Sequence, residues 1–185
     1  MPGVPWPSNF MSVSFRANHM PNLFPTVRHL LLGLVMVLFA PQLLAYDDSA
    51  ALKGVSQGKG LFLIDLAQPQ KLDLYLQIIQ GTHAGMKRQG VEPDFVVVYI
   101  GPSVRFITTE PEDLLAMEHE QVLASIQASI RALRDLGVRQ EVCTIANRVF
   151  GVADASVPDG MQVVADGFVS LIGWQAQGYH LVPIY

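Results

Sequence analysis

The sequence predicts an α/β fold built on a mostly parallel sheet with helices on both faces. Two observations indicate this class. Segments of strand and helix character alternate from residue 61 to the C-terminus. The strand segments are continuously apolar rather than alternating, which is typical of parallel strands buried on both faces. The expected strands are residues 61–66, 94–100, 138–143, 162–165 and 180–185.

The first strand and the first helix are predicted between residues 61 and 89. Residues 61–66 form a short apolar run that ends at Gln-Pro-Gln, which suits a buried strand. Residues 70–89 repeat apolar side chains at helical spacing until Gly90. The predicted inner face of this helix consists of Leu72, Leu76, Ile79, His83 and Met86. Because His83 falls on this stripe, we expect a hydrogen-bonded core or interface histidine there.

The second and third strands are predicted in the middle of the chain. Residues 94–100 are β-branched and aromatic, and a short helix over 104–108 follows a Gly-Pro-Ser turn. Residues 119–136 form the clearest amphipathic helix, with an inner face of Leu123, Ile126, Ile130 and Leu133. Residues 138–143 are the third strand, and a helix over 144–150 follows at once.

The C-terminal part completes the alternation. Residues 153–160 are rich in turn formers. They are followed by a short strand over 162–165, a helix over 168–177 and a last strand over 180–185. The chain therefore has five strands with helices between them.

The first 45 residues are typical of a secretory signal peptide. They contain Arg16 and Arg28 but no acidic residue, then eleven apolar residues at 30–40, then small Ala45 at the expected cleavage position. Eleven residues fall short of the roughly 20 that span a bilayer, so no stable membrane span is expected. We predict a signal peptide over 1–45, with Met20 as an alternative start and an uncleaved membrane anchor as the alternative to cleavage.

Cleavage would leave a secreted or periplasmic chain with one domain at 61–185, preceded by a flexible lead-in at 46–60. All 16 acidic residues lie in residues 46–185 against ten of the 12 Lys and Arg, a net charge of −6. A negative domain without a basic stripe argues against nucleic-acid partners.

Cys143 is the single cysteine of the chain, and it lies where the third strand meets a helix. The carboxyl ends of parallel strands form the crevice in which open α/β sheets bind ligands. Amides at the start of the following helix would stabilise a thiolate there. Free cysteines are also common as small buried hydrophobes, so a reactive thiol and a core side chain both remain open.

Other strand ends bring further residues to the same edge of the sheet. Asp65 ends the first strand and is either a pocket carboxylate or a turn residue. Gly101 and Ser103 follow the second strand, where Ser103 is expected to cap the next helix and the amides to bind an oxyanion or form a plain turn. Thr144 is a candidate cap for the helix after Cys143. Arg148 would steady an anion or remain a solvated surface arginine. Asp166 and Gly167 reach this edge as well.

The five histidines show no metal-ligand spacing, and the chain has no paired cysteines and no His-Glu-x-x-His motif. A Gly-x-Ser-x-Gly elbow is also missing. We therefore expect neither a metal nor a cofactor, and no hydrolase or nucleotide-hydrolase activity.

Four stretches resemble the DsrE/DsrF-like family of sulfur-oxidation and sulfur-relay proteins. They are Phe-Val-Val-Val-Tyr-Ile-Gly-Pro-Ser-Val (95–104), Leu-Gly-Val-Arg-Gln-Glu-Val-Cys (136–143), Val-Phe-Gly-Val (149–152) and Gly-Tyr-His-Leu-Val-Pro-Ile-Tyr (178–185). The resemblance implies a three-layer α/β/α sandwich with a five-stranded parallel sheet, assembled into trimers or hexamers.

In the sulfur-relay members of that family, a cysteine at the position of Cys143 carries a persulfide and passes sulfur between partner proteins. The resemblance therefore implies a cofactor-free sulfur carrier that works with a sulfur donor or acceptor protein, and the predicted signal peptide makes it an exported one. The alternative is a non-catalytic module that binds a small ligand or supports an oligomer, with Cys143 as a buried structural residue.

Overall fold

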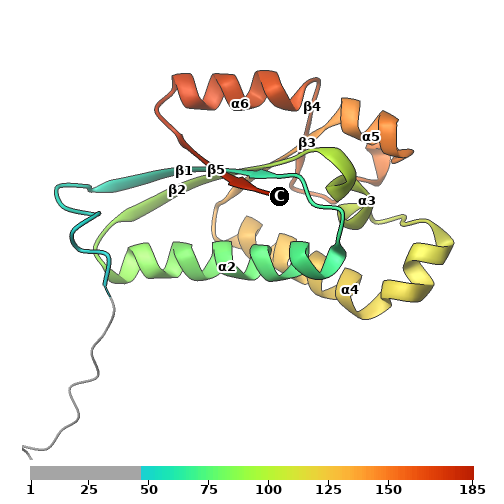
Figure 1. Ribbon diagram of the computed structural model, residues 1–185, viewed down its shortest axis with the longest axis horizontal. Helices are drawn as coiled ribbons and strands as arrows, with labels where there is room; N and C mark the ends of the chain where they lie inside the picture. The colour runs from blue at the N-terminus through green and yellow to red at the C-terminus, as the bar shows by residue number, and fades with distance from the viewer. Residues whose placement is uncertain (1–46) are drawn as a thin grey trace, which may run out of the picture. The chain divides into compact units, whose positions relative to one another are not determined.

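The computed structural model describes residues 47–185 and shows a five-stranded, all-parallel sheet in the order β4-β3-β2-β1-β5 (Figure 1). The strands are β1 (Gln57–Ile64), β2 (Glu92–Tyr99), β3 (Arg139–Cys143), β4 (Gln162–Val164) and β5 (His180–Ile184). All four strand pairings are parallel. The predicted α/β class is confirmed.

The helices form a layer on each face of the sheet. They are α2 (Pro69–Arg88), α3 (Val104–Ile107), α4 (Asp113–Asp135), α5 (Thr144–Phe150) and α6 (Gly167–Ala176), with 3-10 turns η1 (Gly101–Ser103) and η2 (Asp154–Ser156). In Figure 1, α2 and α4 cover one face and α6 covers the other, while α3 and α5 lie near the carboxyl ends of the strands. This is the expected three-layer sandwich.

The larger core lies between the sheet and helices α2 and α4. Its centre is formed by the buried side chains Leu72, Leu76, Ile79, Ile126, Ile130 and Leu133 together with Phe95, Val97 and Tyr99. The apolar stripes predicted for both helices are therefore confirmed. His83 is buried on the same stripe, where its ring meets Phe95 edge-on at a centroid distance of 5.7 Å.

A smaller core lies beneath α6 and consists of Leu61, Val96, Val98, Leu171 and Tyr179. Polar contacts supplement it. The carboxylate of Glu141 on β3 is buried and accepts hydrogen bonds from Ser170 Oγ and from Trp174 Nε1, the latter at 3.1 Å. Because side chains alternate along a strand, Glu141 and Cys143 both face α6.

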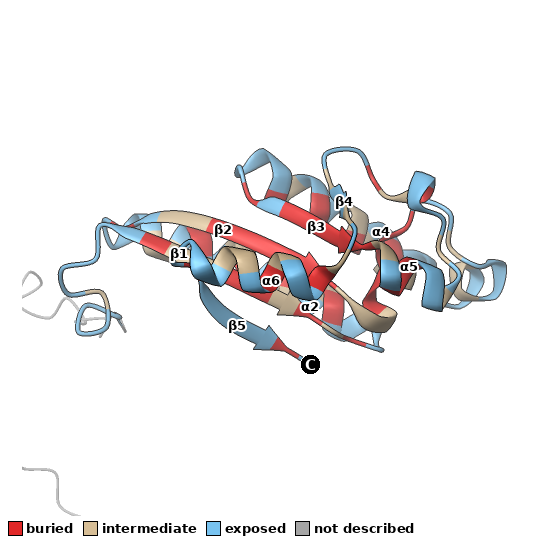
Figure 2. Ribbon diagram, turned by 90° about the horizontal axis from the view of Figure 1, so that it is seen from above, coloured by how far each residue is buried: buried red, intermediate tan, exposed pale blue. Residues whose placement is uncertain are grey.

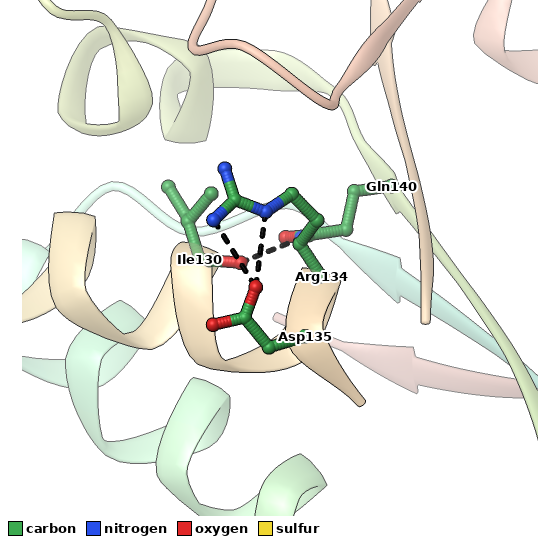
Figure 3. Close-up of polar contacts among 4 residues, drawn as sticks. All are labelled: Ile130, Arg134, Asp135 and Gln140. Carbon is green, nitrogen blue, oxygen red and sulfur yellow. Dashed lines mark hydrogen bonds and ion pairs between the residues drawn. The ribbon is translucent and has the colours of Figure 1, made fainter. Parts of the chain in front are cut away.

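Gln140, between these two residues, faces the opposite layer. Its Nε2 donates to the carbonyl of Ile130 at 2.9 Å, beside the surface ion pair of Arg134 and Asp135 (Figure 3). Its Oε1 accepts from the Tyr99 hydroxyl at 2.9 Å. Burial raises the pKa of Tyr99, so the phenol stays a neutral donor. The position of α4 on β3 is thereby fixed.

Two boundaries differ from the prediction by more than two residues, the starts of β1 and of α4. β1 begins at Gln57, so the last four residues of the expected flexible lead-in belong to the sheet. Their glycine-rich composition hid the strand. A Cβ at Gly58 would lie 2.6 Å from Met86 Sδ and one at Gly60 3.0 Å from Phe95 Cδ1, so large neighbours occupy the space. Residues 1–45, the predicted signal peptide, lie outside the described residues.

Helix α4 begins at Asp113, six residues before the predicted start, and has non-helical dihedrals at His119 (φ −129°, ψ 21°). Leu114 and Met117 in its first part are exposed. Because this segment buries no apolar stripe, helical periodicity could not reveal it. Among residues 47–185, no helix combines the length and apolarity needed to cross a membrane.

Strand β5 forms one edge of the sheet and is largely exposed until Ile184 (Figure 2). Within residues 47–185 its backbone pairs with β1 alone, and the Ile184 carbonyl accepts from the Asp65 amide at 3.0 Å. Pro183, which has no N–H, precedes that residue.

Candidate functional site

A pocket of about 270 Å³ opens at the carboxyl ends of the strands. It is lined by Asp65, Ile100, Gly101, Cys143, Ile145, Ala146, Val149, Phe150, Asp166 and Phe168. These residues come from the ends of β1, β2 and β3, from α5 and from the start of α6. Four of the residues singled out from the sequence, Cys143, Asp65, Gly101 and Asp166, therefore lie together.

Cys143 ends β3, and its side chain is 6% exposed at the wall of this pocket. It occupies the N-cap position of α5 but makes no capping hydrogen bond. Instead, Sγ accepts a hydrogen bond of 3.2 Å from the Gly167 amide. The amide that faces the sulfur thus belongs to the first turn of α6, not to the α5 helix that the sequence indicated.

The close approach of α6 to Cys143 depends on the small size of Gly167. A Cβ at Gly167 would lie 3.1 Å from Cys143 Cβ, 3.4 Å from Sγ and 2.8 Å from Ile100 Cγ2. Any larger residue would push the helix away from the thiol.

Asp166 and Phe168 flank that glycine. Asp166 is the N-cap of α6, where its Oδ1 accepts a hydrogen bond of 2.8 Å from the Phe168 amide. This contact fixes the carboxylate at the pocket wall. It also satisfies an amide that the first turn of the helix would otherwise leave unpaired.

Asp65 and Gly101 meet on the other side of the pocket. Gly101 has a φ of +56°, in the left-handed region that favours glycine. A Cβ at Gly101 would overlap the Asp65 Oδ1 atom. The turn after β2 therefore has two independent reasons for glycine, and one of them is the space that the Asp65 carboxylate occupies.

Ser103 does not belong to the pocket. It is fully buried, and its hydroxyl contacts the carbonyl oxygens of Ile100 at 2.6 Å and Ile64 at 3.3 Å. It makes no capping bond to α3, so the predicted cap role is wrong. The chain passes from the 3-10 turn directly into α3, and Ser103 already has helical dihedrals (φ −58°, ψ −28°). A cap needs extended backbone.

Thr144 and Arg148 also lie away from the pocket. Thr144 Oγ1 donates to Asp154 Oδ2 at 2.7 Å and does not cap α5. Arg148 is exposed, and its Nε makes one long contact of 3.5 Å to the Thr144 carbonyl. The two residues are one helical turn apart and share a face of α5 that differs from the pocket face.

Asp154 joins the η2 turn to α5. Besides Thr144, its carboxylate accepts a hydrogen bond of 2.8 Å from Asn147 Nδ2. The hydrogen bonds from Asn147 and Thr144, together with the nearby charge of Arg148, lower the pKa of Asp154. This ionic anchor, which the sequence analysis missed, holds the helix that forms one side of the pocket.

The charge of the pocket is negative, and its mouth is apolar. Among the lining residues that the structure describes, Asp65 and Asp166 are charged and none is Lys, Arg or His. Ile145, Val149 and Phe168 are 42%, 70% and 64% exposed around it. Sequence reasoning missed these three, although the four-residue spacing of Ile145 and Val149 marks a shared helix face. Within residues 47–185, no group of three or more His, Cys, Asp or Glu is placed to hold a metal ion.

Two solved structures of proteins of unknown function are similar to this chain. A protein of unknown function, MTH1491 from Methanobacterium thermoautotrophicum, is 17% identical, with 69% of this chain and 99% of that one aligned at a TM-score of 0.54. A conserved protein of unknown function, BT1422 from Bacteroides thetaiotaomicron, is also 17% identical, with 75% of this chain and 100% of that one aligned at a TM-score of 0.45. The first of these supports the fold.

No curated protein matches the chain in sequence. A family model, that of the DsrE/DsrF-like family, matches residues 60–184, which is nearly all of the described domain. Because the matched segment covers most of the chain, the chain belongs to the DsrE/DsrF-like family.

Proposed function

We propose that this protein is a sulfur carrier in which Cys143 accepts a sulfane sulfur as a persulfide and passes it on. The observation that carries the proposal is the position of the sulfur. Cys143 Sγ lies at a pocket with room for an added atom and accepts the Gly167 N–H bond at 3.2 Å. Family membership supports the same chemistry by analogy.

The transfer step exchanges one S–S bond for another. The Cys143 thiolate attacks the outer sulfur of a donor R–S–SH, the new bond forms to Sγ, and the donor leaves as R–SH with the proton that Cys143 gave up. No net oxidation occurs. The Gly167 N–H stabilises negative charge on Sγ before the attack and after the sulfur is released.

One observation favours a second function. Cys143 is only 6% exposed, which also suits a structural thiol in a module that binds a small ligand or supports an oligomer. Thiol labelling distinguishes the two. A carrier reacts with a small maleimide in the native state, whereas a structural thiol reacts only after denaturation.

Mass spectrometry of the intact domain tests the carrier directly. Incubation with polysulfide or thiosulfate should add the mass of one sulfur atom to the wild-type domain, and dithiothreitol should remove it. Cys143→Ser should gain nothing. An unchanged wild-type mass, or equal gain in Cys143→Ser, would contradict the proposal.

We also propose that the carrier acts as a homo-oligomer outside the cytoplasm, in keeping with the predicted signal peptide over 1–45. N-terminal sequencing of the exported protein checks cleavage after Ala45. Sedimentation analysis of the mature chain distinguishes a trimer or hexamer from a monomer.

A further inference from the structure

We infer that the sulfur-exchange partner of Cys143 is a basic protein that docks on an apolar collar around the pocket and presents a cationic group beside its reactive sulfur. The collar is defined as Ile145, Val149 and Phe168. This inference rests on the proposed function and adds the kind of partner to it.

The collar has the features of a docking surface. Its three side chains are 42%, 70% and 64% exposed, although each is a large hydrophobe. They come from two elements, α5 and the start of α6, and all three line the pocket that contains the thiol. Apolar side chains grouped around a functional opening are typical of protein contact sites. A small-molecule donor in the pocket would leave the apolar side chains of the collar exposed to water.

The negative charge of the pocket inside the collar favours a positively charged partner. Asp65 and Asp166 line the pocket, and no basic side chain does. The Asp166 carboxylate is held in place by the Phe168 amide at 2.8 Å. Two carboxylates beside an apolar wall slow the approach of anions relative to cations, because the low dielectric of the wall strengthens both effects.

The same charges act at every stage of the transfer. An ionised persulfide on Cys143 and the thiolate that remains after sulfur release are both anionic and lie beside the same carboxylates, so an anionic partner is repelled at either stage. A cation on the partner offsets this repulsion while the two sulfurs approach each other. The partner therefore needs a Lys or Arg next to its own reactive sulfur.

Charge also argues against a second copy of this chain as the occupant. Face-to-face pairing of two copies would bring Asp65 and Asp166 of one protomer toward the same carboxylates of the other. Like charges that are brought together in an apolar contact are unfavourable. The net charge of −6 over residues 46–185, from 16 acidic and ten basic residues, points to a basic partner as well.

Three small disulfides of similar size test the charge selection without a persulfide. They are cystamine (cationic), bis(2-hydroxyethyl) disulfide (neutral) and dithiodiglycolate (anionic). In each reaction the Cys143 thiolate attacks one sulfur, a mixed disulfide forms, and one reagent thiol leaves with the proton. Mass spectrometry gives the rate of the mixed disulfide.

Cystamine is expected to react at least about tenfold faster than dithiodiglycolate at low salt, with the neutral reagent between them. The double variant Asp65→Asn, Asp166→Asn should reduce the ratio of the cystamine rate to the dithiodiglycolate rate. Asparagine keeps the cap of α6 at position 166, so the fold is preserved. High salt should reduce the same ratio of rates in the wild-type protein. Equal rates for all three reagents in the wild type would overturn the inference.

Two capped peptides test the collar. Mixed disulfides of Phe-Lys-Cys-Phe and Ser-Lys-Cys-Ser with 2-mercaptoethanol carry the same charge but differ in apolar area. The apolar peptide is expected to react several-fold faster with the wild type. Val149→Ser should reduce the ratio of the two peptides' rates, and the variant should still fold because the Val149 side chain is 70% exposed. A ratio that is unchanged in Val149→Ser overturns the collar as a docking surface.

Sedimentation of Val149→Asp is the control for self-association. The wild-type oligomer should persist in this variant. A fall in mass on this substitution would make the collar an interface between copies and overturn the inference. The two proposals fail in different ways. If neither a disulfide nor polysulfide reacts with native Cys143, the proposed sulfur carrier is wrong. If sulfur loading is normal but the three disulfides react at equal rates, only the proposed basic partner is wrong.

Discussion

The amide of Gly167 donates a hydrogen bond of 3.2 Å to Cys143 Sγ, and this contact joins the first turn of α6 to the end of β3. The sulfur therefore sits between two secondary-structure elements that are 24 residues apart in the chain. Its environment depends on how α6 rests on the sheet, and α6 rests on the smaller of the two cores.

Gly167→Ala should move α6 and perturb the thiol. The added Cβ would lie 2.8 Å from Ile100 Cγ2 and 3.1 Å from Cys143 Cβ. Overpacking of this kind costs roughly 1–3 kcal/mol in the free energy of unfolding. Urea denaturation measures the loss, and the alkylation rate of Cys143 should change with it.

Gly173→Ala in the same helix is the matched control. A Cβ at Gly173 meets nothing within 4 Å, so the variant should gain up to about 1 kcal/mol from helix propensity. If both alanine variants behaved alike, close packing at Gly167 would not be the cause.

Glu141→Leu should loosen α6 from the sheet. The substitution leaves the indole N–H of Trp174 and the hydroxyl of Ser170 without their acceptor. Both donors are half-buried, so each lost hydrogen bond should cost about 0.5–1.5 kcal/mol in the free energy of unfolding. Hydrogen exchange of the α6 amides should accelerate, whereas exchange in α2, on the opposite face, should not. Glu141→Gln, which keeps an acceptor oxygen, should have the smaller effect.

Asp154 should contribute an acid-sensitive part of the stability. Its pKa is lowered below 3.8 in the folded state by hydrogen bonds from Asn147 and Thr144. The stabilisation is therefore fully present above pH 3.8 and is lost as the pH falls through the lowered folded value. Denaturation midpoints of wild type and Asp154→Asn should converge as the pH falls through this window. A constant difference would argue against the anchor.

His83 should contribute a second pH dependence in a different window. Burial and the nearby charge of Lys87 lower its pKa below 6.5. The unfolded chain then binds more protons than the native state just below pH 6.5, so stability rises with pH and is complete above that value. His83→Leu should remove this slope between the folded pKa and pH 6.5, which thermal melts can measure.

The strands and long helices were predictable because their burial is one-sided or complete. The stripe of Leu72, Leu76 and Ile79 follows from spacing alone, and the strand ends place Asp65, Gly101 and Cys143 at one edge.

The partners of the thiol were not predictable in this way. The residues next to Cys143 in sequence drew attention to Thr144 and Arg148, which share a helix face outside the pocket. The Gly167 amide comes from a helix whose docking depends on tertiary packing. Local sequence patterns do not reveal such a contact. For this reason the prediction that α5 amides face the thiol was wrong.

The edge strand β5 has a consequence for how copies of this chain can meet. Within a strand, the N–H and C=O of one residue point to the same side, and those of the next residue point to the other. The Ile184 carbonyl points toward β1, so the nitrogen of Pro183 points to the open edge, where it has no proton to donate. A strand that paired with this edge would lack one backbone hydrogen bond. This edge is therefore a poorer template for an added strand than a fully paired edge would be.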